Sequence, residues 1–148
     1  MVRVQREDFD AAAESAALSA GRVDVGAVVT FVGLCRDDGG NLSALELEHY
    51  PGMAEAEMER VAAEAEARWP LAGIVAIHRF GAIRPGEQIV MVAAASAHRA
   101  AAFAAAEMLM DYLKTRAPFW KRAVLTDGAN QSWVAAKEAD DSAAERWA

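Results

Sequence analysis

Apolar residues recur every three or four positions in two long segments of the chain, which is the spacing of one helix face. From Ala54 to Trp69 this spacing is accompanied by a glutamate-rich opposite face, and Pro70 ends the segment. His98–Arg116 is rich in alanine and ends before Pro118. Both segments are predicted helices. The core-facing stripe of the second is expected to contain Phe103, Ala106, Met110 and Leu113.

A shorter helix is predicted at Asp8–Ser19, with Asp8 as the N-cap and Gly21 as the stop. The tail after Ala135 is polar, and a short helix and a frayed end are its two alternatives. We expect one domain over residues 1–148, with a mobile tail from about residue 138.

Continuous or alternating apolar runs predict strands in the remaining segments. Val25–Leu34 is apolar on both faces, which is typical of a buried strand, and Glu87–Ser96 is apolar enough to be central. The other predicted strands are Val2–Gln5 at an edge, Ala44–Tyr50, Ile74–Phe80 and Trp120–Thr126. Strands and helices mix without strict alternation, so the prediction is an α+β fold with a largely antiparallel sheet.

Composition narrows the functional classes. The chain has 148 residues, of which 36 are alanine, so many of its apolar contacts suit close backbone approach. Its net charge of −7 argues against nucleic acid and anionic membranes as partners. Cys35 is the single cysteine, which excludes an internal disulfide and fits the reducing cytoplasm. The longest apolar run, Ile89–Ala95, is too short to span a bilayer.

Common cofactor and metal motifs are missing from the sequence. The three histidines, His49, His78 and His98, are far apart and share no metal-ligand spacing. There is no P-loop, no G-x-G-x-x-G fingerprint and no G-x-S-x-G elbow. We therefore expect no metal and no bound cofactor.

Positive charge gathers in the segment His98–Arg122. It carries five basic and two acidic residues, for a net charge of +3 in an otherwise acidic chain. Such a cationic island is a candidate pocket for a small anion, and a solvated surface is the alternative.

Individual residues allow two readings each. His98 and Arg99 begin a predicted helix, where free N–H groups favour an anion, although a histidine cap and a solvated arginine also fit. Lys121 lies among aromatic and cationic neighbours and is either an acid, base or nucleophile or a plain surface lysine. Arg36 follows a strand at a glycine-containing loop, where functional side chains are common. Cys35 is interpreted as a small buried hydrophobe in preference to a reactive thiol.

Five segments together resemble the MoaE family, the large catalytic subunits of molybdopterin synthase. The resemblance rests on GAVVTFVGLCR at Gly26–Arg36, LELEHYPGMAEAEM at Leu45–Met58, IHRFGAIRPGE at Ile77–Glu87, SAHRAAAFAAAEMLMDYLKTRAPFWKR at Ser96–Arg122, and Gly128 with Trp133. The segments follow the family's order and cover most of the chain. The succession from HR through DYLK to PFWK is the most specific part.

The resemblance implies a reaction and an assembly. A cyclic pyranopterin monophosphate receives two sulfurs and becomes the dithiolene of molybdopterin. Each sulfur comes from the C-terminal thiocarboxylate of a small ubiquitin-like carrier, the MoaD type. The family forms a central dimer of large subunits with one small subunit at each end. Its fold is an α/β hammerhead with an additional α+β portion.

Matching by motif assigns roles to residues of this chain. Lys114 and Lys121 resemble the catalytic pair, which would hold the carrier tail and move protons. The residues that resemble substrate-binding groups are Arg36, His98, Arg99 and Arg122, with Phe31 and Met110 as pocket walls.

Helix geometry adds an inference about the assembly. His98 and Lys114 are sixteen residues apart on one predicted helix. At a rise of about 1.5 Å per residue they are ~24 Å apart, too far to meet one small substrate. If both serve one site, they must come from different chains, so the site is expected to cross a dimer interface.

Two positions depart from the family's pattern. Ala123 stands where an acidic residue often follows the basic pair Lys121-Arg122, and Lys137 stands where an arginine often follows the late tryptophan. Ala123 removes one partner for Lys121, and Lys137 lacks the planar guanidinium fork. The alternatives to an enzyme are a non-catalytic dimeric module that binds a small phosphorylated ligand and a scaffold for the small partner.

Overall fold

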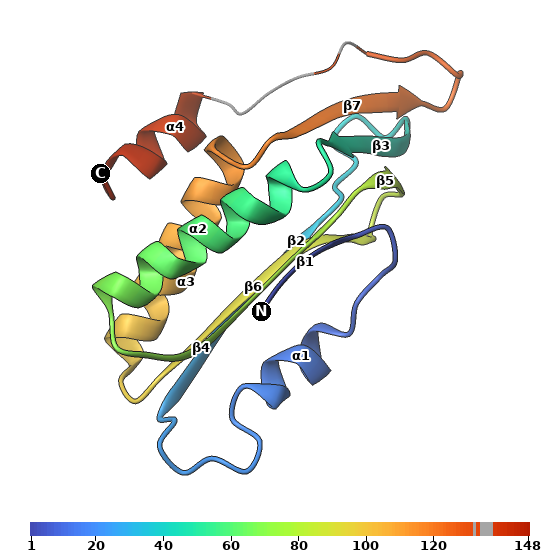
Figure 1. The fold of residues 1–148 in the computed structure, drawn as a ribbon. Helices are drawn as coiled ribbons and strands as arrows, with labels where there is room; N and C mark the ends of the chain where they lie inside the picture. Colours follow the sequence, from blue (N-terminus) through green and yellow to red (C-terminus); the bar gives the residue numbers. More distant parts are fainter. Residues whose placement is uncertain (132, 134–137) are drawn as a thin grey trace.

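The computed structural model describes residues 1–131, 133 and 138–148, which form seven strands and four helices (Figure 1). The strands are β1 (Val2–Gln5), β2 (Ala27–Leu34), β3 (Leu42–His49), β4 (Leu71–Arg79), β5 (Gly81–Ile83), β6 (Gln88–Ser96) and β7 (Phe119–Leu125). The helices are α1 (Ala11–Ala17), α2 (Met53–Arg68), α3 (Arg99–Thr115) and α4 (Glu138–Glu145).

The strands form two sheets. The larger has the order β1-β4-β6-β2, in which only the β1–β4 pair is parallel. The smaller has the order β5-β3-β7 and is antiparallel throughout. The predicted α+β class with mainly antiparallel strands is confirmed, as are the edge position of β1 and the central position of β6.

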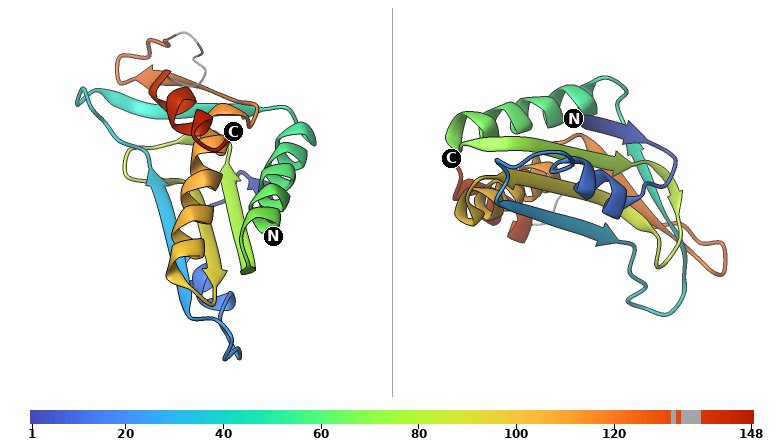
Figure 2. Two further views of the ribbon diagram at one scale, coloured as in Figure 1. Left: turned by 90° about the vertical axis from the view of Figure 1, so that its left-hand side faces the viewer. Right: turned by 90° about the horizontal axis from the view of Figure 1, so that it is seen from below.

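Helices cover both faces of the four-stranded sheet. Helices α2 and α3 lie on one face and the short α1 on the other, while the three-stranded sheet lies beyond one end (Figures 1 and 2). The main core lies between the sheet and the helix pair, and eight of the eighteen buried residues described in it are alanine. Ala94 of β6 and Ala105 of α3 belong to this core and have no exposed surface. Alanine at these positions lets the helices approach the sheet closely.

The prediction that Val25–Leu34 is a buried strand is wrong. β2 lies at the edge of the larger sheet, where it pairs only with β6. Phe31 is 42% exposed and Leu34 is 57% exposed. A strand with two apolar faces is usually central, but here β2 leaves apolar side chains and one backbone edge without a partner in the described chain.

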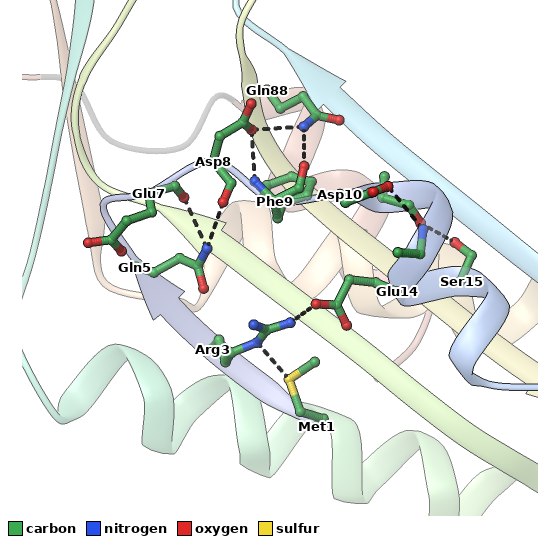
Figure 3. Close-up of polar contacts among 12 residues, drawn as sticks. Met1, Arg3, Gln5, Glu7, Asp8, Phe9, Asp10, Glu14, Ser15 and Gln88 are labelled. Carbon is green, nitrogen blue, oxygen red and sulfur yellow. Dashed lines mark hydrogen bonds and ion pairs between the residues drawn. The ribbon is translucent and has the colours of Figure 1, made fainter.

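The N-cap of the first helix is Asp10, which corrects the prediction of Asp8. The Asp10 carboxylate accepts a hydrogen bond from the Ala13 N–H at 3.0 Å. Asp8 instead accepts from the Phe9 N–H and from the Gln88 side-chain amide of β6 (Figure 3). The hydrogen bond from Gln88, and next that from Phe9, lowers the pKa of Asp8. Asp8 therefore anchors the segment before α1 to the sheet.

Helix α3 buries a face slightly rotated from the predicted one. Ala106, Met110 and Leu113 are buried as expected, but Phe103 is 61% exposed. The buried face is centred on Ala102, Ala105, Leu109 and Tyr112. Phe103 lies at the rim of this face, so its ring points away from the core, which corrects its placement in the core stripe.

The polar tail takes the helical alternative. After α4, the indole Nε1 of Trp147 donates to the Asp111 carboxylate of α3 at 2.6 Å, and the Arg146 guanidinium binds the same carboxylate at 2.9 Å. The Trp147 ring meets Trp69 edge-on. These contacts hold the C-terminal segment against α3. No helix among the described residues has both the length and the apolar character needed to cross a membrane.

Candidate functional site

A cavity of about 130 Å³ opens where α3 ends, between the larger sheet and the smaller one. Strands β2, β4 and β6, the C-terminal turn of α3, and strands β3 and β7 all contribute to its wall. The lining residues are Phe31, Gly33, Leu34, Leu45, Leu47, His78, Ile89, Val90, Met110, Leu113, Lys114, Ala117, Phe119, Trp120 and Lys121.

Two lysines from different elements meet in this cavity. Lys114 lies in the last turn of α3 and is exposed, while Lys121 lies on β7 and is half-buried. Pro118 follows the helix and turns the chain into β7. The register pairs Lys121 with Leu47 of β3, which places both side chains on the cavity face of the smaller sheet. The cavity thus holds the two lysines that resemble the family's catalytic pair.

The rest of the wall is largely apolar. Phe31 and Met110 line it, as the sequence prediction stated, and Gly33 contributes backbone without a side chain. A Cβ at Gly33 would come within 2.8 Å of the Val90 side chain and 3.3 Å of the Phe31 ring. Among the described residues that line the cavity, none is acidic. In such surroundings two cations act on an anionic guest with little competition.

His78 also lines the cavity, and sequence reasoning assigned it no role. Its ring stacks on Phe119 with centroids 3.8 Å apart, and its Nδ1 lies 2.8 Å from the backbone oxygen of Arg79. Burial of the ring, and next the positive charge of Lys114, lower the pKa of His78 to about 4. Strand alternation could have indicated that His78 faces inward. Alternate residues of a strand share one face, and His78 follows Ile74 and Ala76, which belong to the main core.

His98 and Arg99 lie at the opposite end of α3 from Lys114. His98 is the N-cap residue and its side chain makes no capping hydrogen bond, which removes the capping interpretation. Arg99 begins the helix, and both side chains are exposed. The helix runs unbroken to Thr115, so the predicted separation of ~24 Å between His98 and Lys114 holds within one chain.

Arg36 and Arg122 lie near the cavity without lining it. The Arg36 guanidinium is exposed beyond the end of β2 and binds the Asp38 carboxylate at 2.6 Å. Arg122 follows Lys121 on β7, so its side chain is on the other face of the strand. It binds Glu46 at 2.7 Å and lies over the Trp133 ring.

Ala123 is one of the two positions that depart from the family's pattern. It lies on the same face of β7 as Lys121 and pairs with Leu45, which lines the cavity. An acidic side chain at this position would therefore lie close to Lys121. Lys137 lies outside the described residues. No cluster of histidine, cysteine, aspartate or glutamate in the described part of the chain could hold a metal ion.

Comparison with known proteins identifies the family of this chain. Residues 4–116 match the family described as MoaE protein. The chain belongs to the MoaE family. A relative from Mesorhizobium japonicum, named molybdopterin synthase catalytic subunit, is 70% identical over 99% of this chain and 92% of its own length. The matched residues include Lys114 but end before Lys121.

Solved structures of MoaE proteins share the fold. The MoaE protein from Burkholderia ambifaria superposes with a TM-score of 0.84 at 49% identity, covering 99% of this chain and 97% of that one. A complex of subunits 1 and 2 of the molybdopterin-converting factor from Helicobacter pylori contains a chain with a TM-score of 0.71. It is 20% identical to this chain over 93% of this chain and 90% of that one, which supports the fold alone.

Proposed function

We infer that this protein is the catalytic subunit of a molybdopterin synthase. It transfers sulfur from the thiocarboxylated C-terminus of a small carrier subunit to cyclic pyranopterin monophosphate, and so makes the dithiolene of molybdopterin. Membership of the MoaE family and the name of the 70% identical relative support this function. The structural observation that carries it is that Lys114 and Lys121 line one largely apolar cavity.

The cavity suits the end of a peptide that carries a thiocarboxylate. Its apolar wall, with Phe31 and Met110, packs against the chain of the carrier tail and excludes water from the anionic end. Lys114 and Lys121 bind the sulfur-bearing anion through charge-assisted hydrogen bonds. The same two groups then hold or supply protons as sulfur adds to the pterin and water leaves.

Among the described residues, the cationic side chains that line the cavity are those of Lys114 and Lys121, and the phosphate of the substrate needs further cations. His98 and Arg99 are exposed at the far end of α3, beside free backbone N–H groups that favour an anion. We place Arg36, His98 and Arg99, together with Arg122, as substrate-binding residues in a site shared by two copies of the chain. One copy contributes His98 and Arg99, and the other contributes Lys114 and Lys121.

The surface that would join the two copies is exposed in this chain. β2 has an open edge, and apolar side chains beside it are Val28, Phe31 and Leu34, with Phe103 on the neighbouring helix α3. An apolar surface next to an open strand edge favours association. A homodimer covers this surface and completes the site in one step.

The second partner is a small ubiquitin-like carrier of the MoaD type. The Helicobacter pylori structure of similar fold is a complex of two subunits, which is consistent with such a partner. A cytoplasmic location stays a prediction from the single cysteine and the acidic composition.

The decisive experiment is reconstitution. The purified protein is incubated with cyclic pyranopterin monophosphate and a thiocarboxylated carrier, and the dithiolene product is measured. We expect turnover by the wild type and a loss of at least about a hundredfold in Lys114→Met and Lys121→Met, because each variant removes a cation from the reacting centre. Arg60→Met is the matched control, since Arg60 lies on the outer face of α2 in ion pairs with Glu57 and Glu64.

Binding separates the enzyme from the alternatives. In an enzyme, the lysine variants lose turnover while the substrate still binds with modestly reduced affinity. Full turnover in both lysine variants would contradict the proposed roles. Phosphorylated ligand bound without any dithiolene formation would favour a non-catalytic module. Unchanged function in Arg36→Ala with an intact dimer would favour a scaffold.

A further inference from the structure

Arg79 is a buried charge on the face of the larger sheet that α1 covers. It is the last residue of β4 and continues the row of Val75 and Ile77, which belong to the core on that face. The residue is only 7% exposed. Among the described residues, the carboxylate that reaches it is that of Glu87, with Nη1 and Oε2 4.0 Å apart. An ion pair of this length does not account for the burial of a full charge.

The Arg79 guanidinium instead joins two segments of backbone. Its Nε donates to the Arg6 carbonyl oxygen at 3.1 Å, and its Nη1 donates to the Gln88 carbonyl oxygen at 2.8 Å. Arg6 follows β1, and Gln88 begins β6. A guanidinium can serve both acceptors because its N–H donors spread in a rigid planar fork, which the single ammonium of a lysine lacks. Arg79 therefore fixes the point at which β6 begins.

The turn between β5 and β6 continues these contacts. The Glu87 carboxylate accepts a hydrogen bond from the Arg84 N–H at 2.7 Å, and the Glu87 N–H donates to the Arg84 carbonyl oxygen at 3.0 Å. Gly86 lies within the turn at a φ of +87°, a backbone conformation that other residues rarely adopt. The turn is thus closed by its own hydrogen bonds and is held by Arg79 where it joins β6.

The same turn holds the end of β2. The Cys35 N–H donates to the Glu87 carbonyl oxygen at 2.8 Å, and the Gly86 N–H donates to the Cys35 carbonyl oxygen at 2.7 Å. These two bonds extend the pairing of β2 with β6 past Leu34, where the register shifts. Arg36 is the next residue along the chain. The turn therefore sets the direction in which the backbone of Arg36 leaves the sheet.

We propose that Arg79 is a positioning residue for Arg36. Its guanidinium holds Gln88, the turn before Gln88 holds Cys35, and Cys35 begins the segment that carries Arg36. Arg79 acts from the face of the sheet opposite the two lysines and does not touch the substrate. The proposal rests on the proposed function, in which Arg36 binds the substrate.

Substrate kinetics test this role. Arg79→Met keeps most of the side-chain length and removes every N–H donor. We expect it to raise the KM for cyclic pyranopterin monophosphate about tenfold, because hydrogen bonds from a buried charge are lost. The kcat is expected to stay within about threefold of the wild type, since a displaced Arg36 weakens substrate binding more than the chemical step. Arg79→Lys keeps the charge but not the fork, so its KM is expected to lie between the two.

A double-mutant cycle separates positioning from a general structural role. In an Arg36→Ala background, Arg79→Met is expected to change KM by less than about twofold, because its effect passes through Arg36. Fully additive effects on KM would overturn the proposal, as would an unchanged KM in Arg79→Met. An unchanged KM in Arg36→Ala would contradict the substrate role of Arg36 and the proposal with it. Thermal unfolding establishes that each variant is folded.

A second measurement is independent of the reaction. Cys35 is the single cysteine and is 4% exposed, and its Sγ lies 3.7 Å from the Ile83 carbonyl oxygen. Its rate of reaction with DTNB therefore reports how often the turn opens. We expect Arg79→Met to raise this rate about tenfold, because the turn loses its attachment to the sheet.

Val75→Ala is the matched control for thiol labelling. Val75 lies buried on the same face of β4, but it pairs with Ala93, away from the turn. We expect its labelling rate within about twofold of the wild type, since it lowers stability without opening the turn. A wild-type rate in Arg79→Met, or equal acceleration in both variants, would overturn the proposal. Absence of dithiolene formation by the wild type would instead refute the proposed function, and the labelling rates would still decide whether Arg79 holds the turn.

Discussion

At the scale of single residues, chemistry depends on what surrounds each group. Lys114 and Lys121 gain their significance from an apolar cavity without acidic lining among its described residues. Cys35, interpreted from the sequence as a small buried hydrophobe, is buried, and burial followed by the Glu87 charge raises the pKa of its thiol. His78 is a half-buried polar residue whose ring stacks on Phe119 and bonds to the backbone of Arg79.

The low pKa of His78 predicts a pH dependence of stability. The unfolded histidine binds a proton below about pH 6.5 and the folded one only below about pH 4. In this window the unfolded state holds more protons, so the free energy of unfolding falls as the pH falls. The full effect is roughly 2–3 kcal/mol by pH 4.

Urea denaturation between pH 7 and pH 4 measures this effect. The wild type is expected to lose more stability than His78→Gln, which lacks the titrating group. Both proteins share all carboxylates, including Asp8, so their acid titration cancels in the difference. Parallel pH profiles for the two proteins would show that His78 is not buried in its neutral form.

At the scale of elements, the packing partners of each strand or helix determine which of its side chains are buried and which reach the cavity. β2 has the composition of a central strand but lies at an edge, where it pairs with β6 alone among the described strands. β7 pairs with β3 across seventy or more residues of sequence, and this pairing places Lys121 against Leu47. Helix α4 lies on α3 through Trp147 and Arg146, which bind Asp111.

The docking of the C-terminal segment predicts a contribution to stability from Trp147. Its indole packs against the main core and Trp69 and donates to Asp111. Trp147→Ala is expected to lower the free energy of unfolding by about 2–3 kcal/mol, from lost apolar burial and one hydrogen bond to a charge.

Trp133→Ala is the matched control for this prediction. Trp133 is 41% exposed and lies under the Arg122 guanidinium. Its removal is expected to cost about 0.5 kcal/mol or less. Equal losses in the two variants, measured by urea denaturation, would contradict the view that the C-terminal segment is part of the packed structure.

At the scale of the whole molecule, the cavity lies at one end of α3, and two of the proposed substrate-binding residues, His98 and Arg99, lie at the other. One rigid helix separates His98 and Arg99 from Lys114, so a single copy does not bring them to one small substrate. In the proposed dimer, the exposed apolar surface beside β2 and Phe103 contacts a second copy of the chain. The proposed function therefore makes the dimer, and not the chain, the unit that reacts.

A shared site predicts complementation between inactive variants. His98→Ala and Lys114→Ala are mixed after dissociation and reassociated. Half of the random dimers are mixed, and each of these has one intact site, so about a quarter of wild-type activity returns. Native mass spectrometry of tagged chains verifies the exchange.

The control pairs His98→Ala with Arg99→Ala. Both substitutions affect the group of residues contributed by the same copy, so every site in a mixed dimer carries one defect. We expect no recovery for this pair. Full exchange without recovery in the His98→Ala and Lys114→Ala mixture would reject the shared site.

The sequence by itself determined the elements and the chemical inventory of this protein. Apolar spacing predicted both long helices, the central strand and the α+β class, because helix and strand periods are local properties of the chain. The resemblance to MoaE proteins named Lys114, Lys121, Phe31 and Met110, all of which line one cavity.

Only the tertiary structure decided which of these residues meet. The edge position of β2, the outward ring of Phe103 and the cap at Asp10 depend on which segments pair, and pairing joins residues far apart in sequence. The same holds for His78, which lines the site because β4 and α3 end, and β7 begins, at one place. Local periodicity encodes which face of an element is apolar, whereas long-range packing determines what that face contacts.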